Sequence, residues 1–137
     1  MPATPTNTFT NAPLAPFYAP EEAYQYHVKL PVSTTTVKGT VLGELTATPG
    51  SFKAYTSGAV DGSQTPRALL TYDVSVDASG VHTIANDQGW TGLSAPAYFS
   101  GMFRTAELTG LDATAMTNSS AWKLLNGSVT DGVLRIG

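Results

Sequence analysis

The chain has 137 residues, of which 42% are hydrophobic and only 12% are charged, and its net charge is −3. This length and composition predict one globular domain whose polar surface consists largely of uncharged side chains. The scattered basic residues argue against nucleic-acid binding, and the lack of cysteine excludes disulfides and thiolate chemistry. No apolar run is long enough to span a membrane, and the first residues do not have the pattern of a secretory signal.

Residues 1–36 differ in composition from the rest of the chain. They hold six of the nine prolines and only three charged residues. Because proline removes a backbone donor and biases its predecessor towards extended conformations, the first twenty residues are not expected to form a helix or a central strand. We interpret 1–36 as an extended N-terminal arm before a β domain at 37–137. Its first part carries spaced apolar residues, namely Phe9, Leu14, Phe17 and Tyr18.

One segment of this arm has the pattern of a strand. In residues 24–30, "YQYHVKL", apolar and polar side chains alternate strictly, which is the period of a half-buried strand. The predicted apolar face consists of Tyr24, Tyr26, Val28 and Leu30. The sequence leaves open whether this strand pairs within its own chain, with a neighbouring copy, or with another protein by strand addition.

Beyond the arm, short strands and turns follow one another. Strands are predicted in the ranges 37–45, 52–55, 67–76, 95–108 and 131–136. Asp61-Gly62 and the segment 77–80 have the composition of turns. One short helix is predicted after Asp112, over 113–126 or only 120–126. The fold class is therefore expected to be mainly β, with one short C-terminal helix and an extended N-terminal arm.

Two segments have weak similarity to functional motifs. Ser94 lies in a G-x-S-x-P sequence, which differs from the nucleophile elbow of hydrolases at Pro96, where the elbow needs glycine. A hydrolase that pairs Ser94 with His82 is therefore only a minor hypothesis. The segment from Asp73 to Asp77 lacks the glycine and glutamate of an EF-hand calcium loop, so a structural turn is the preferred interpretation.

The two tryptophans have two interpretations. Trp90 and Trp122 are candidate interface anchors, although ordinary core packing is the simpler explanation. The sequence contains no phosphate loop, no dinucleotide fingerprint and no carboxylate pair of readable geometry. We therefore expect no catalytic residues, no metal site and no cofactor.

Four segments, taken in order, resemble a known family. They are "KGTVLGEL" at 38–45, "FKAYTSGAVDGSQTPRALLTYDV" at 52–74, "APAYFSGMFRTAEL" at 95–108 and the closing "DGVLRIG". Together they resemble the lambda-type head decoration proteins of tailed phages. Two departures from the family pattern are the long arm and an insertion at 78–94.

The resemblance implies a β-clip fold and a homotrimer on the outer face of an expanded phage head. The partner would be the major capsid protein, with no nucleic acid and no membrane involved. The protein would be made in the host cytoplasm and would act in the virion as a non-enzymatic cement against internal DNA pressure. The apolar residues of the arm, from Phe9 to Leu30, would bind the capsid. The alternative is a β domain of the phage tail or fibre, or of another virion part, that serves adhesion.

Overall fold

The computed structural model describes residues 13–16, 23–84, 91–103, 105–112, 122–124 and 134–136. The strands before the 85–90 gap are β1 (Gln25–Val28), β2 (Thr34–Thr36), β3 (Val41–Glu44), β4 (Phe52–Ala54), β5 (Ala68–Leu70), β6 (Val74–Val76) and β7 (His82–Ile84). Those after it are β8 (Thr91–Gly92), β9 (Ala95–Tyr98), β10 (Gly101–Phe103), β11 (Trp122–Leu124) and β12 (Leu134–Ile136). The described residues also form one 3-10 turn, η2 (Thr105–Glu107), but no α-helix. The expectation of a mainly β protein is confirmed.

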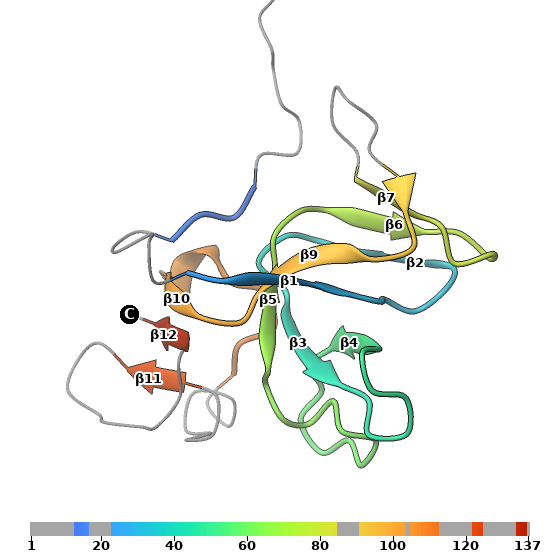
Figure 1. Cartoon of the computed structure of the whole chain (residues 1–137). Coiled ribbons are helices and arrows are strands. Elements are labelled where there is room, and N and C mark those ends of the chain that lie inside the picture. The colour runs from blue at the N-terminus through green and yellow to red at the C-terminus, as the bar shows by residue number, and fades with distance from the viewer. Residues whose placement is uncertain are drawn as a thin grey trace, which may run out of the picture.

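A five-stranded antiparallel sheet organises the protein, with the order β1-β9-β5-β3-β4 (Figure 1). Its first and last strands are also joined, because Lys29 and Ser51 form a parallel bridge. The Lys29 N–H donates to the carbonyl of Gly50 at 3.0 Å, and the Phe52 N–H donates to the carbonyl of Lys29 at 2.7 Å. The sheet therefore closes on itself at this end.

Side chains on both faces of the five-stranded sheet are buried. In β3, Val41 belongs to one hydrophobic cluster and Leu42 to another, on opposite faces. All three residues of β5 are fully buried, which explains why its sequence is a continuous apolar run and does not alternate. The protein thus has two small cores separated by one sheet.

A four-stranded antiparallel sheet, with the order β2-β6-β7-β8, covers one of these faces. It contributes Val74, Val76 and Ile84 to the cluster that contains Leu42. The chain passes from β1 in the first sheet to β2 in the second through residues 29–33. This crossover ends at Ser33, whose φ of 56° is unusual for a residue with a side chain.

The opposite face of the five-stranded sheet is covered by segments distant in sequence. Leu14 and Phe103 are buried there against Val41 and Leu69, with Leu108 and Leu111 packed beside them. The Leu14 N–H donates to the carbonyl of Thr71 at 2.7 Å, so residues 13–16 lie along the sheet. A parallel three-stranded sheet, β10-β12-β11, follows near the C-terminus (Figure 1).

One sequence prediction needs correction, while the division at residue 37 stays a prediction. The strands β1 and β2 lie within 1–36 and pair with β9 and β6. The predicted C-terminal helix is contradicted at Trp122–Leu124, which form β11. The reason there is pairing with β12, a long-range interaction that overrides local helix propensity. The rest of the predicted helix lies outside the described residues.

The loop between β4 and β5 is a turn, as the sequence predicts. Gly62 has a φ of 107°, which favours glycine, and a Cβ there would lie against the carbonyl oxygen of Glu44. Asp61 Oδ1 accepts hydrogen bonds from the N–H of Ser63 at 3.0 Å and from its hydroxyl at 2.6 Å. The loop packs tightly over β3, because a Cβ at Gly43 would lie 2.6 Å from the Cα of Ser63.

Candidate interaction surface

The first strand pairs within its own chain. The register joins Gln25 to Tyr98 and Val28 to Ala95, so β1 lies antiparallel to β9. Of the pairings that the sequence leaves open for the strand at 24–30, the structure shows the one within the chain. The apolar face of β1 is therefore the continuation of a face that β9 already presents.

Along this face the four predicted apolar residues have different environments. Val28 and Leu30 are buried in the cluster beneath the four-stranded sheet. Tyr24 and Tyr26 are 60% and 62% exposed, because the second sheet does not cover this end of β1. The strand thus changes from core to surface within a few residues.

Phe99 connects the exposed tyrosines to the core. It follows β9, and its ring lies 5.5 Å from that of Tyr26 at an angle of 81° between the planes. On its other side it lies 5.5 Å from the ring of buried Phe52 at 88°. Both contacts are edge-to-face, a favourable arrangement for aromatic rings. We call Tyr24, Tyr26 and Phe99 the aromatic edge.

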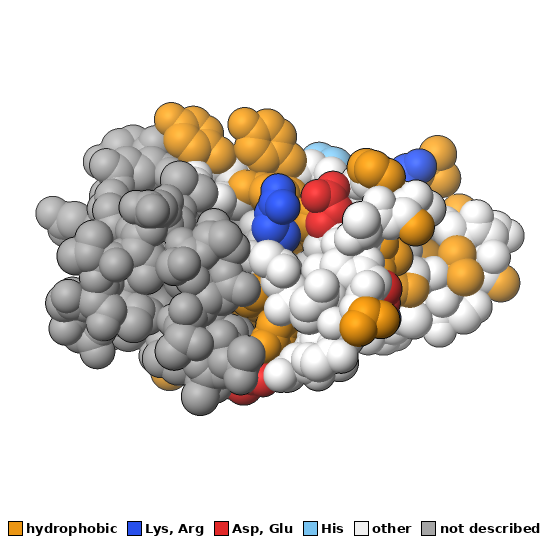
Figure 2. Space-filling model, turned by 90° about the horizontal axis from the view of Figure 1, so that it is seen from below, with side chains coloured by type: hydrophobic (Ala, Val, Ile, Leu, Met, Phe, Trp, Pro, Cys, Tyr) orange, Lys and Arg blue, Asp and Glu red, His pale blue; other side chains and the backbone are white. Residues whose placement is uncertain are grey.

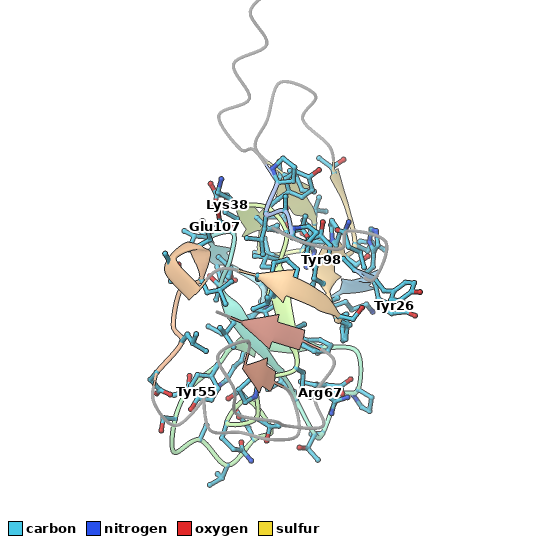
Figure 3. The ribbon with its side chains drawn as sticks, turned by 90° about the vertical axis from the view of Figure 1, so that its left-hand side faces the viewer. Tyr26, Lys38, Tyr55, Arg67, Tyr98 and Glu107 are labelled. Atoms are coloured by element: carbon cyan, nitrogen blue, oxygen red, sulfur yellow. The ribbon has the colours of Figure 1, made fainter. Side chains whose placement is uncertain are left out.

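The backbone of the aromatic edge is fixed by hydrogen bonds. The Phe99 N–H donates to the carbonyl of Tyr24 at 2.9 Å, and the Tyr24 N–H donates to the hydroxyl oxygen of Ser100 at 3.0 Å. Figure 3 shows Tyr26 pointing away from the ribbon, whereas Tyr98, on the opposite face of β9, lies among the strands. Hydrophobic side chains also protrude along one border of the described surface in Figure 2. Exposed aromatic side chains on a backbone that is already fixed are typical anchors of protein interfaces.

The structure places the other predicted contact residues elsewhere. Leu14 is buried in the core, with an exposed fraction of 4%, so it contributes to the protein's own packing. Trp122 lies in β11. Phe9, Phe17, Tyr18 and Trp90 are outside the described residues. Of the predicted contact residues that are described, Tyr24 and Tyr26 have exposed side chains.

Phe99 was not singled out from the sequence. A signal for it exists, because side chains alternate between the two faces of a strand, so a strand over "APAYF" places Phe99 on the same face as Ala97. The register pairs Ala97 with Tyr26, so Phe99 is the diagonal neighbour of Tyr26 across the strands. Finding it required knowing that β1 pairs with β9, which sequence alternation does not reveal.

The hydrolase hypothesis pairs Ser94 with His82, but the structure does not bring these two residues into contact. Both ring nitrogens of His82 have other partners, the N–H of Leu30 and the carbonyl of Gly80. Ser94 instead lies beside His27, with 2.9 Å between its hydroxyl oxygen and the Nδ1 of His27. This contact is exposed and links the bend before β9 to β1.

The two aspartates of the segment with weak similarity to a calcium loop accept hydrogen bonds from backbone N–H groups. Asp77 Oδ1 accepts hydrogen bonds from the N–H groups of Ser79 and Val81 at 2.8 and 2.9 Å, which forms the turn between β6 and β7. Asp73 Oδ1 accepts from the N–H of Lys38 at 2.7 Å. Across the part of the chain that the structure describes, there is no cluster of three or more His, Asp or Glu side chains arranged to hold a metal ion.

Among the described residues, the shortest ion pair joins β4 to the loop that follows it. Lys53 Nζ is 2.6 Å from Asp61 Oδ2, with both side chains partly exposed. The hydrogen bond from Lys53, together with those from Ser63, holds the pKa of Asp61 well below its usual range. This cluster stabilises the loop and does not involve the aromatic edge.

Comparison with known proteins gives no family assignment. No protein-family model matches the chain, and no curated protein or solved structure matches it either. Among the described residues, no helix is long and apolar enough to cross a membrane.

Proposed function

We propose that the protein is a capsid decoration protein of the lambda type, which binds the outer face of an expanded phage head as a homotrimer and stabilises it. The proposal rests on the ordered resemblance of about residues 37–137 to that family. The finer description of the fold as a β-clip belongs to the same proposal. The observation that favours a binding role is the aromatic edge, whose two tyrosines are exposed and whose Phe99 ring packs against the buried ring of Phe52.

Within this proposal, Tyr24 and Tyr26 contact the major capsid protein. Two exposed tyrosines supply a large contact area, and each loses little side-chain entropy because it has only two rotatable side-chain bonds. Their backbone is already fixed by hydrogen bonds, so little further ordering is needed there. Tyr24 and Tyr26 follow closely after the proline-rich start of the chain. The arm and the aromatic edge would therefore both contact the major capsid protein. A bound trimer would repeat this contact three times, which raises the total affinity without new kinds of contact.

Co-sedimentation with empty phage heads tests the function. Purified protein is mixed with expanded and with unexpanded heads, and we expect it to sediment with the expanded form alone. Light scattering on the free protein tests the trimer. Equal binding to both forms, or to neither, would contradict the decoration role, and density on the tail in electron micrographs of virions would favour the adhesion alternative.

A matched pair of variants tests the surface. Tyr24→Ala combined with Tyr26→Ala removes the two exposed rings, and we expect at least about tenfold weaker binding to expanded heads, in line with the loss of interface anchors. The control is Val60→Ala, which removes an apolar side chain that is 94% exposed in the loop after β4. It should bind as the wild type does. Equal affinity of both variants would contradict the assignment of the surface.

A further inference from the structure

A buried histidine holds the point at which the chain crosses between the two sheets. His82 lies in β7 with an exposed fraction of 2%. Its Nε2 accepts a hydrogen bond from the N–H of Leu30 at 2.8 Å, while its Nδ1 lies 3.0 Å from the carbonyl oxygen of Gly80. A carbonyl only accepts, so Nδ1 carries the ring proton and Nε2 has none. The geometry therefore requires the neutral imidazole in one tautomer.

We infer that His82 is a proton-sensitive latch on the crossover between β1 and β2. Protonation of the ring turns Nε2 into a donor that faces the Leu30 N–H, so two donors oppose each other in a buried site. One of them must then lose its partner or move. Histidine is the side chain that most often serves as a pH switch in proteins, so acidification is the trigger to test. Protonation of this ring breaks the hydrogen bond that holds the crossover, whatever the protein binds.

The ring shares a groove with one charged side chain. Lys29 lines the same groove as His82, a depression of about 400 Å³ between the crossover, the start of β4 and the turn before β7. Asp77 is in the adjacent turn, but its Oδ1 is bonded to the N–H groups of Ser79 and Val81. Glu44 Oε2 accepts from the N–H of Gly50 in the turn before β4. The strand neighbours Val76 and Gly92 are uncharged.

The latch has a defined place in the fold. Leu30 directly follows Lys29, whose bridge to Ser51 closes the five-stranded sheet. The second histidine of the chain, His27, acts on the same strand through its contact with Ser94. Release at Leu30 therefore loosens the C-terminal end of β1, while the pairing with β9 keeps the aromatic edge in place.

Hydrogen exchange of single amides, followed by NMR on the whole protein, tests this inference. Between about pH 7.5 and pH 5.5, a range that brackets ordinary histidine titration, the protection factor of the Leu30 amide should fall roughly tenfold, as expected for one lost buried hydrogen bond. The Arg67 amide, which donates to the carbonyl of Leu42 at 2.8 Å, is the internal reference. A Leu30 protection factor that does not change relative to that of Arg67 would overturn the latch.

Two variants and one spectrum identify the responsible group. In His82→Gln, the amide oxygen accepts a hydrogen bond at either pH, so the pH response of Leu30 should vanish. In His27→Gln it should persist, and the reverse pattern would contradict the assignment. Ring nitrogen shifts of the wild type provide a readout without substitution, because Nε2 should lack a proton at about pH 7.5 and gain one as Leu30 protection falls. A proton on Nε2 at the higher pH would also overturn the inference.

Discussion

The two ends of β1 follow one alternating pattern but lie in opposite environments. At the C-terminal end, Val28 and Leu30 are buried beneath the four-stranded sheet, and the chain is held by the His82 ring. At the N-terminal end, Tyr24 and Tyr26 extend beyond that sheet into solvent. The difference teaches that alternation identifies the face of a strand, while the extent of the covering layer decides which residues of that face are available to a partner.

The largest effect is expected at the buried end. Leu30→Ala removes a side chain that is 5% exposed and should lower the free energy of unfolding by about 2–5 kcal/mol, the usual range for such truncations. Tyr24→Ala, on the same face at the other end, should change it by less than about 0.5 kcal/mol. Urea unfolding measures both. Similar losses in the two variants would remove the distinction between core and surface along β1.

A second, smaller effect concerns the loop that supports the sheet. Gly43→Ala would place a Cβ 2.6 Å from the Cα of Ser63, and we expect a loss of about 1–3 kcal/mol from overpacking. Gly50→Ala is the control, because it combines a positive φ of 91° with no atom within 4 Å of the added Cβ. It reports backbone strain without a clash. If unfolding experiments gave Gly43→Ala no penalty, the close packing of this loop on β3 would be contradicted.

The ring contact within the aromatic edge should have a measurable but modest effect on stability. Tyr26→Ala removes the edge-to-face contact with Phe99, which is worth about 0.5–1.5 kcal/mol in such pairs. Tyr26→Phe keeps the ring and is the matched control. We expect thermal unfolding to separate the two variants by a few degrees. If Tyr26→Ala were as stable as Tyr26→Phe, the ring contact between Tyr26 and Phe99 would not stabilise the folded protein.

The smallest effect is expected from the exposed charge cluster, and it depends on pH. The folded pKa of Asp61 is lowered by Lys53 and Ser63, so its contribution to stability is present above the unfolded value of about 3.9 and is lost as the pH falls through the folded value. Asp61→Asn should therefore lower the urea midpoint at neutral pH and have less effect in strong acid. A deficit that stays constant down to about pH 2 would mean that ionisation of Asp61 does not stabilise the loop.

Much of the sheet could be predicted from local patterns. The buried run of β5, the alternation of β1 and the Asp61-Gly62 turn each have a local cause that the sequence states directly. By contrast, β2 consists of three threonines without an apolar face, so no periodicity distinguishes it from a loop. The strand β11 was predicted as helix because its parallel pairing with β12 depends on residues distant in sequence.

The sequence singled out part of the candidate surface. The structure exposes the rings of Tyr24 and Tyr26, whereas Leu14, Val28 and Leu30 form part of the protein's own core. Whether an apolar residue binds a partner or packs internally depends on the covering segments, and these come from elsewhere in the chain. The same reason explains why the contact between His82 and Leu30, 52 residues apart, could not be inferred from the sequence.

Electron cryomicroscopy of expanded heads saturated with the protein tests the central claim most directly. We predict three copies around each local three-fold position, with the rings of Tyr24 and Tyr26 buried against the major capsid protein. Density that showed the protein bound through another surface, with both tyrosines facing solvent, would contradict the account.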